Sequence, residues 1–294
     1  MKRRITLGPP AGLTGVISAV AVLAGALAFN RFAALYRTLP SEEQLRNFSP
    51  ALSTKILDRS GELVAELYTE KRTWVDYQRL PKHLLSAVLA IEDHEFYRHW
   101  GISPRGIVRA MFSNLRHGGL AAGGSTITQQ LAKVAFLSHR RTLTRKLKEL
   151  ILSLKLEQNY SKNEILEMYL NQVYFGNGAY GVSQAARFYF SKDVSELTLA
   201  ESALIASLIR SPMHYSPVKH PERARERRNV VLKRMYRLRW ISRDEYLAAS
   251  ASTLTVTTGI AAATRAPYFV EYIREQLERR YPPETLYNGG LVVR

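Results

Sequence analysis

Cysteine is absent from this 294-residue chain, and acidic residues are few. Without cysteine the protein can form no disulfide and has no thiolate nucleophile, so cysteine usage says nothing about its redox compartment. The 25 Asp and Glu residues are outnumbered by 42 Lys and Arg residues, which gives a formal net charge of +17. Such an excess of basic residues favours a polyanionic partner. The candidates are nucleic acid, an anionic membrane surface and a phosphorylated substrate.

Long uncharged apolar runs are also scarce, and the prominent one covers residues 11–29 after the basic residues at 2–4. This run is long enough to cross a membrane, and the positive-inside rule keeps the short basic end in the cytoplasm. The small-x-small sequence at 26–28 is the alternative sign of a cleaved signal peptide, but the run exceeds a usual signal core, so we favour an uncleaved anchor. Either interpretation places the rest of the chain outside the cytoplasm. We therefore expect no nucleic-acid partner.

The remaining sequence divides into a tether, a folded domain and a tail. Apolar residues make up 46% of the chain, enough for a real core. Two β-rich runs at 55–58 and 63–68 flank turn residues and predict a hairpin, which residues 73–77 are expected to extend. The sequence predicts a basic cytoplasmic end at 1–10, an anchor at 11–29, a tether at 30–54, a folded domain at 55–240 and the start of a linker at 241–294.

Helix start signals recur from residue 81 to about 240. Ser103 precedes a proline that suits a first helical turn, and three Ser or Thr residues are each followed three positions later by glutamate, as in a capping box. These pairs are Ser161 with Glu164, Thr198 with Glu201, and Ser242 with Glu245. The sequence therefore predicts a mainly α domain with a short N-terminal β-hairpin.

Glu92 is the first candidate for chemistry. On a helix it lies on the same side as Leu85 and Val88, at the margin of an apolar stripe. Partial desolvation of a carboxyl raises its pKa, which suits a general base or acid near neutrality. The alternative is a helix ending in solvated acids. His94 and His99 are five residues apart, so they do not share a helix face and do not form a zinc motif.

A second charged cluster lies on a helix predicted at 142–159. Leu143, Leu147, Leu150, Ile151 and Leu154 form one apolar face, while Arg145, Glu149, Leu152 and Leu156 share another side. Lys146 lies three residues before Glu149. Because this helix is apolar on two sides, we expect these charged groups to face a cleft; an ordinary surface ion pair is the alternative.

Four further segments carry weaker signals. Residues 123–130 place glycines and hydroxyl residues at a helix start, where they either leave N–H groups for phosphate oxygens or act as ordinary N-caps. The glycine-rich run 115–124 fits a mobile flap or a surface loop, and the apolar Met111, Phe112, Leu115 and Leu120 fit bilayer contact or core packing. Residues 175–181 predict an inter-helix turn, and the basic run 223–239 predicts a solvated helix face or a membrane-attracted one.

Taken together, the motifs resemble those of the peptidoglycan glycosyltransferases of family 51. In order and spacing they are Glu92-Asp93-x-x-Phe96-x-x-His99-x-Gly101, Gly123-Gly124-Ser125-Thr126-Ile127-Thr128-Gln129-Gln130, Arg145-Lys146-x-x-Glu149, Lys162-x-x-Ile165-Leu166-Glu167-x-Tyr169-Leu170-Asn171 and Arg210-Ser211-Pro212-x-x-Tyr215-Ser216-Pro217. Enzymes of this family form the membrane-anchored N-terminal module of class A penicillin-binding proteins, or stand alone.

The resemblance implies a lysozyme-like, two-lobed fold and polymerisation of lipid II at the outer face of the bacterial cytoplasmic membrane. In that reaction an acceptor 4-hydroxyl attacks C1 of the muramyl unit of the growing glycan chain, with inversion and release of undecaprenyl pyrophosphate. The resemblance implies that Glu92 is the base and that Glu149 assists the leaving group, directly or through a divalent Mg or Mn ion. It implies phosphate binding by Arg145, Lys146 and Lys133, and positioning of the chain by Thr126 and Gln130. Support for the first motif would come from Asp93, Phe96 and His99. Many relatives carry asparagine where Val134 follows Lys133, which puts one donor-site contact in doubt.

The tail from Pro267 resembles the linker that leads into a penicillin-binding transpeptidase domain. The one Ser-x-x-Lys runs from Ser216 to Lys219 inside the fifth motif, and Lys-Thr-Gly is absent. We therefore expect a polymerase half without acyl-transfer activity. Two other functions compete: a lysozyme-like muramidase or lytic transglycosylase, which needs no pyrophosphate-binding cations, and a membrane-tethered binding module, which gives no reason for acids in apolar surroundings.

Overall fold

The structure is a computed structural model that describes residues 22–294 apart from 24, 27–28, 47–53, 68–72, 117–123, 138–141, 258–266, 283–284 and 287–290. Most of the predicted anchor and of the glycine-rich run 115–124 therefore lies outside the described residues. Residues 29–37 are helical. Among the helices that are described, none is both long and apolar enough to span a membrane.

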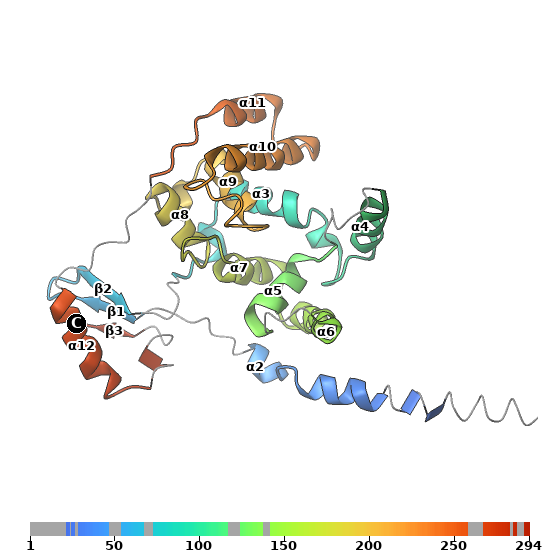
Figure 1. Cartoon of the computed structure of the whole chain (residues 1–294), viewed down its shortest axis with the longest axis horizontal. Coiled ribbons are helices and arrows are strands. Elements are labelled where there is room, and N and C mark those ends of the chain that lie inside the picture. Colours follow the sequence, from blue (N-terminus) through green and yellow to red (C-terminus); the bar gives the residue numbers. More distant parts are fainter. Residues whose placement is uncertain are drawn as a thin grey trace, which may run out of the picture.

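The core of the helical body is built around α3 (Lys82–Glu92), α7 (Lys162–Gln172) and α9 (Leu199–Leu208). α9 is buried along most of its length and packs closely against α3 and α10 (Pro221–Arg237). On α3 the predicted stripe is confirmed, because Leu84, Leu85 and Val88 are buried. Figure 1 shows these helices at the centre, with α10 on one side and α6 on the other.

The remaining helices complete the helical body. They are α2 (Glu42–Arg46), α4 (Pro104–Arg116), α5 (Ile127–Phe136), α6 (Leu143–Asn159), α8 (Val182–Phe190) and α11 (Arg243–Ala251), with short 3-10 turns η1 (Tyr77–Arg79), η2 (Phe96–Arg98) and η3 (Val194–Glu196). Ser161, Thr198 and Ser242 each cap a helix, with the glutamate three residues on completing a capping box. The four predicted helix starts, including that of α4 after Ser103, are confirmed.

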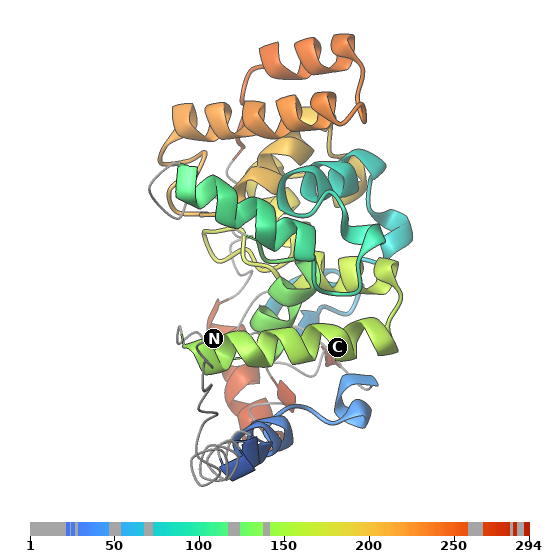
Figure 2. The same ribbon diagram turned by 90° about the vertical axis from the view of Figure 1, so that its right-hand side faces the viewer.

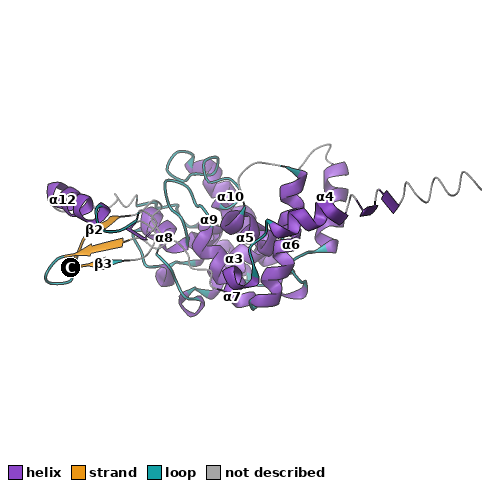
Figure 3. Cartoon of the chain, turned by 90° about the horizontal axis from the view of Figure 1, so that it is seen from below, coloured by secondary structure: helices purple, strands orange, loops and turns teal. Residues whose placement is uncertain are grey.

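A small sheet joins the two ends of the described chain. β1 (Thr54–Leu57) pairs antiparallel with β2 (Leu63–Leu67) and parallel with β3 (Val292–Val293), in the order β2-β1-β3. α12 (Pro267–Glu278) packs on it, and Ile56, Ala65, Val270 and Leu286 form a second small core. Figure 3 shows this unit at the opposite end of the body from α4. The predicted hairpin is confirmed, and its partner is the C-terminal strand.

The expected extension of the sheet at 73–77 is wrong, because residues 73–76 are irregular and η1 follows. The backbone there has a side chain as its partner: the N–H of Val75 donates to Asn171 Oδ1, and Asn171 Nδ2 donates to the Val75 carbonyl, both at 2.9 Å. A carboxamide carries the same donor and acceptor as a peptide unit, so one asparagine replaces a strand. The strand-like sequence could not reveal this partner.

The inter-helix turn predicted at 175–181 is confirmed. It joins α7 to α8, and Tyr174 pairs with Tyr180 across it as an isolated bridge. Gly181 adopts φ +79°, and a Cβ there would lie 2.8 Å from the Asn171 carbonyl oxygen. Glycine is required at this position by both the backbone conformation and the close approach of α7.

The helix α6 buries its charged side and exposes its leucine side. Leu143 is 91% exposed, and Leu147 and Leu154 are each 42% exposed, whereas Glu149 and Leu156 are buried. Periodicity identified both faces correctly but could not tell which one meets the core, because both are apolar. Figure 2 shows α6 crossing the molecule below α5.

The sequence predicted a solvated or membrane-attracted helix face for the basic run on α10. The structure shows that this run is not uniformly solvated. Arg228 is 1% exposed and donates to the backbone carbonyls of Ser250 and Ser252 at the end of α11. The rings of Tyr236 and Tyr246 stack with centroids 5.3 Å apart. α11 therefore packs onto α10, and the helical body continues beyond residue 240, where the sequence suggested that a linker begins.

Candidate active site

Glu92 is the last residue of α3 and remains partly exposed at the edge of the core. Its Oε2 accepts a hydrogen bond of 2.8 Å from Gln130 Nε2 on α5. Protein surrounds most of the carboxyl, and this burial raises its pKa, against the opposing effects of the Gln130 hydrogen bond and the charges of Arg227, Arg210 and Lys133. The predicted environment of Glu92, an acid at the margin of the apolar stripe, is confirmed.

Asp93 begins the turn after α3 and ties two segments together. Its Oδ2 accepts from His99 Nε2 at 2.9 Å and from the backbone N–H of Ile127 at 3.1 Å, and both Asp93 and His99 are buried. The anion at the start of α5 is thus a carboxylate of the protein itself, which the helix dipole favours. Thr126 caps this helix, and its capping box with Gln129 uses a further N–H group. The N-cap interpretation is therefore confirmed, and the Ile127 and Gln129 N–H groups have partners within the protein.

Thr126 and Phe96 are both buried beside the site. Thr126 Oγ1 donates to the carbonyl of Gly101 at 2.6 Å. Gly101 has φ +75°, and a Cβ there would lie 2.8 Å from the backbone oxygen of Ser153 on α6, so only glycine fits. Phe96 has no exposed surface, and Lys162 Nζ lies 4.3 Å from its ring centre. Phe96 and Thr126 can hold the site in shape, but Phe96 has no surface to offer a substrate.

Glu149 on α6 is held between two cations. Its oxygens lie 2.6 Å from Arg145 NH1 and 2.9 Å from Lys146 Nζ, and the residue is 4% exposed. Lys146 Nζ also donates to Ser125 Oγ at 3.0 Å and to Gln129 Oε1 at 3.4 Å. Within the described part of the chain, Arg145 Nε is buried and makes no hydrogen bond. The cluster therefore has one positive charge in excess and a free donor.

The residues present at Glu149 do not fit a metal ion. A divalent cation of the Mg or Mn type takes oxygen ligands, usually several carboxylates or carbonyls. Both Glu149 oxygens already contact cations, and the described residues contain no group of three His, Asp or Glu side chains able to hold a metal. The ammonium and guanidinium groups occupy the positions that a metal would need.

A small cavity of about 10 Å³ lies between Glu92 and the start of α5. It is lined by Glu92, Asp93, His94, Glu95, Ser103, Gly106, Arg109, Gly124, Ser125 and Thr126. Ser125, which lines this cavity, also accepts a hydrogen bond from Lys146 of the Glu149 cluster. Burial and the nearby charges of Arg234 and Arg109 lower the pKa of His94, so this imidazole takes up a proton less readily than a solvated one. Lys133 is exposed and acts on Glu92 by charge.

Three residues at Glu92 had received no role from the sequence. Arg227 of α10 and Arg210 after α9 both act on the Glu92 carboxyl by charge, and the Arg227 guanidinium lies 5.5 Å from the Tyr215 ring centre. Tyr169 of α7 is fully buried and donates to Gln130 Oε1 at 2.9 Å. Nothing in the basic run of the sequence distinguishes Arg227 from its neighbours. For Tyr169, the one available signal was a lone hydroxyl on an apolar helix face.

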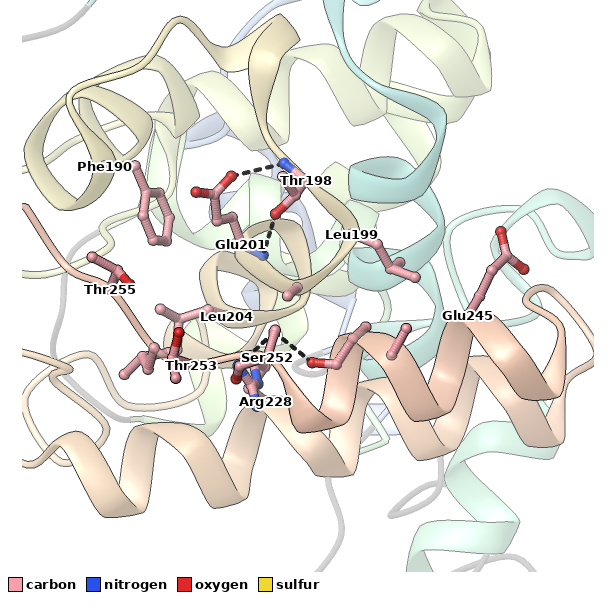
Figure 4. A pocket seen from close by; sticks show the side chains of 14 residues that line it. Phe190, Thr198, Leu199, Glu201, Leu204, Arg228, Glu245, Ser252, Thr253 and Thr255 are labelled. Atoms are coloured by element: carbon pink, nitrogen blue, oxygen red, sulfur yellow. Dashed lines mark hydrogen bonds between the residues drawn. The ribbon is translucent and has the colours of Figure 1, made fainter.

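A larger cavity of about 460 Å³ lies elsewhere, between α9, α10 and α11 (Figure 4). Its polar groups already have partners within the protein. Glu201 and Glu245 complete capping boxes with Thr198 and Ser242, and Arg228 binds the end of α11. This cavity therefore has no carboxylate free for acid–base chemistry.

Comparison with known proteins identifies the family. The family model described as Transglycosylase matches residues 60–236. Penicillin-binding protein 1A of Aquifex aeolicus (strain VF5) is 41% identical over 282 residues, which cover 96% of this chain and 38% of that protein. Penicillin-binding protein 1F of Bacillus subtilis (strain 168) is 42% identical over 247 residues, covering 82% of this chain and 34% of that protein.

Among solved structures, penicillin-binding protein 1A from Haemophilus influenzae matches with 27% identity and a TM-score of 0.48, covering 83% of this chain and 26% of that chain. The present chain spans little more than a third of the length of these relatives. The family model covers more than half of the chain, and it includes the segments that carry Glu92 and Glu149. The chain belongs to the transglycosylase family, as its motifs had indicated.

Proposed function

We propose that this protein is a peptidoglycan glycosyltransferase that polymerises lipid II into glycan strands, with inversion at the muramyl C1 and release of undecaprenyl pyrophosphate. The observation that carries the proposal is a partly buried carboxylate, Glu92, at a small cavity whose lining residue Ser125 also contacts the cation cluster at Glu149. An inverting displacement needs a base at the attacking hydroxyl and positive charge at the departing pyrophosphate. Family membership supports the reaction class.

Glu92 takes the role of general base in this proposal. Burial raises its pKa, so its carboxylate is a stronger base than that of a solvated glutamate, while the nearby cations favour its ionised form. The acceptor 4-hydroxyl transfers its proton to Glu92 as the oxygen attacks C1. Gln130 binds the other side of the carboxyl and fixes its direction. Asp93 and His99 fix the turn that carries it.

Lys146 and Arg145 take the role of leaving-group stabilisers. The exposed parts of the Lys146 and Arg145 side chains are available to pyrophosphate oxygens, and Lys133 adds charge from α5. Glu149 keeps the two cations in place, because two neighbouring cations without an anion between them would repel. This function needs no metal at Glu149. A muramidase needs no such cluster, so the cations favour synthesis over cleavage.

The proposal places the protein at the outer face of the bacterial cytoplasmic membrane, with a lysozyme-like, two-lobed catalytic domain and a single N-terminal span. Exposed apolar side chains support membrane contact: Phe112 on α4 is 70% exposed and Leu143 on α6 is 91% exposed. For Phe112, this exposure favours bilayer contact over core packing. The net charge of +17 favours anionic lipid and a pyrophosphate-bearing substrate, with no nucleic acid involved.

The test is incubation of detergent-solubilised protein with labelled lipid II, read as glycan length on a gel. Wild type is expected to give a ladder and Glu92→Gln none, while Glu222→Gln, an exposed acid on α10, serves as the matched control and keeps the ladder. Shortening of preformed glycan with no use of lipid II would instead identify a muramidase. Binding of lipid II without turnover by wild type, in detergent and in liposomes, would identify a binding module.

A further inference from the structure

A chain of two hydrogen bonds runs from the core to Glu92. Tyr169 on α7 donates its hydroxyl to Gln130 Oε1 at 2.9 Å, and Gln130 Nε2 donates to Glu92 Oε2 at 2.8 Å. Tyr169 is fully buried, whereas Gln130 and Glu92 are partly buried. The three residues come from three helices, α7, α5 and α3, that meet at this point.

The direction of this chain depends on the tyrosine proton. A carboxamide has a donor end and an acceptor end of nearly the same shape, so its orientation is fixed by its partners. Burial and the charges of Glu92 and Asp93 raise the pKa of Tyr169 well above its usual value, so its hydroxyl stays protonated and can donate. With Gln130 Oε1 held by that hydroxyl, its NH₂ group must face Glu92.

This orientation discriminates between the two forms of Glu92. An ionised carboxylate accepts the Gln130 N–H, but a protonated carboxyl would need an acceptor for its own proton, and the Gln130 oxygen is engaged elsewhere. We propose that Tyr169 is a positioning residue that, through Gln130, holds Glu92 in its proton-accepting form. The proposal rests on the role of Glu92 as base. It adds a residue that touches neither substrate nor the reacting atoms.

Cations around Glu92 also favour its ionised form, and they act by charge. Arg227 comes from α10, Arg210 from the segment after α9, and Lys133 from α5. Asp93 is the neighbouring acid and is buried in its own hydrogen bonds with His99 and α5. None of the cations contacts Tyr169 or Gln130 by a hydrogen bond in the described part of the chain. Removing the tyrosine hydroxyl therefore leaves these charges in place and tests the orientation of Gln130 alone.

The experiment compares Tyr169→Phe with Tyr189→Phe in the full chain. Tyr189 is also fully buried, and its hydroxyl donates to the Phe175 carbonyl and accepts from Asn177, so its loss removes a similar bond away from Glu92. In Tyr169→Phe the Gln130 amide is free to turn and accept the proton of a neutral Glu92. The acid limb of kcat/KM for lipid II should then move up by about half a unit to one unit, while Tyr189→Phe follows wild type.

A direct titration separates this inference from the proposed function. Glutamate labelled with ¹³C at the side-chain carboxyl reports ionisation of Glu92, whose signal is assigned by its absence in Glu92→Gln. The same upward shift is expected in Tyr169→Phe and none in Tyr189→Phe, whether or not the protein turns over lipid II. An unchanged Glu92 titration in Tyr169→Phe would overturn the inference, and an inactive wild type would overturn only the proposed function.

A double variant shows whether Tyr169 acts through Gln130. In Gln130→Leu the amide is gone, so adding Tyr169→Phe should shift the Glu92 titration no further than Gln130→Leu alone. Equal shifts on both backgrounds would mean that the hydroxyl acts on Glu92 directly or through general loosening of the core, and the positioning role would be rejected.

Discussion

Gln129 and Gln130 are adjacent in sequence, yet their side chains bind charged groups of two different clusters. Gln130 Nε2 donates to Glu92 at 2.8 Å, while Gln129 Oε1 accepts from Lys146 Nζ at 3.4 Å. Successive residues on a helix point about 100° apart, so two neighbours can contact two separate groups. α5 therefore sets the spacing between the proposed base and the proposed leaving-group cations, and its position matters to both.

Asp93→Asn is expected to loosen α5. The substitution removes the negative charge at the helix start and weakens the bonds to His99 and to the Ile127 N–H. We expect a loss of about 1–3 kcal/mol in the free energy of unfolding, measured by chemical denaturation, together with a large loss of polymerisation. Thr198→Ala, which removes the cap of α9, should lower stability by about 1 kcal/mol and keep activity. Full activity in a destabilised Asp93→Asn would contradict a role for this bond in placing α5.

Glu92→Gln is expected to be inactive but more stable than wild type at neutral pH. Burial raises the pKa of Glu92, so the folded state binds the proton more tightly than the unfolded state does. That contribution stabilises the protein at low pH and is lost as the pH rises through the folded-state pKa. Glutamine does not ionise, so Glu92→Gln does not lose this stabilisation as the pH rises. Its melting temperature should therefore exceed that of wild type at pH 7. The difference should disappear below pH 4.5, the ordinary pKa of the group. Equal melting temperatures at pH 7 would mean that Glu92 is not desolvated.

Arg227→Gln is expected to make activity more sensitive to acid. The Arg227 charge favours the ionised form of Glu92, so its removal raises the Glu92 pKa further and moves the acid limb of the pH–activity profile to higher pH. Arg225→Gln on the same helix is the matched control, because Arg225 is exposed and pairs with Glu222. A profile measured over the acid range should shift for Arg227→Gln alone. The same shift in both variants would point to net charge and not to this site.

Glu149→Gln is expected to lose activity without any change in its response to divalent ions. The carboxylate holds Arg145 and Lys146 at 2.6 and 2.9 Å, so its loss frees two cations to repel each other. Titrations of polymerisation with MgCl₂ and with EDTA should change wild type and Glu149→Gln by the same factor. A magnesium response present in wild type and missing in the variant would show that Glu149 binds the ion, against the donor set seen here.

The sequence predicted local features well where a single short-range interaction explains why a residue type occurs at its position. Capping residues such as Ser161 and Thr198 satisfy helix-end N–H groups of their own chain segment, so their effect is readable within four positions. The partial burial of Glu92 followed from its place beside Leu85 and Val88. The motifs that resemble family 51 identified the family, which the match over residues 60–236 shows.

Features that depend on a distant partner were missed or reversed. Residues 73–77 look like a strand, but the partner of Val75 is the Asn171 side chain, almost a hundred positions away. The two apolar faces of α6 are indistinguishable by period, and only the packing of α5 against it buries the side with Glu149. Arg227 and Arg228 are neighbours in one basic run, yet one acts on Glu92 and the other binds the end of α11.

By itself, the sequence determined the helix starts, the hairpin, the charge balance and the acids that carry the candidate chemistry. These follow from short-range hydrogen bonding, side-chain periodicity and composition, which need no knowledge of the packing. The tertiary structure alone decided that Asp93 occupies the start of α5, that Tyr169 reaches Glu92 through Gln130, and that the side of α6 with Glu149 is the buried one. Directional hydrogen bonds and short-range electrostatics depend on distances of a few ångströms between helices, and only the packed fold sets those distances.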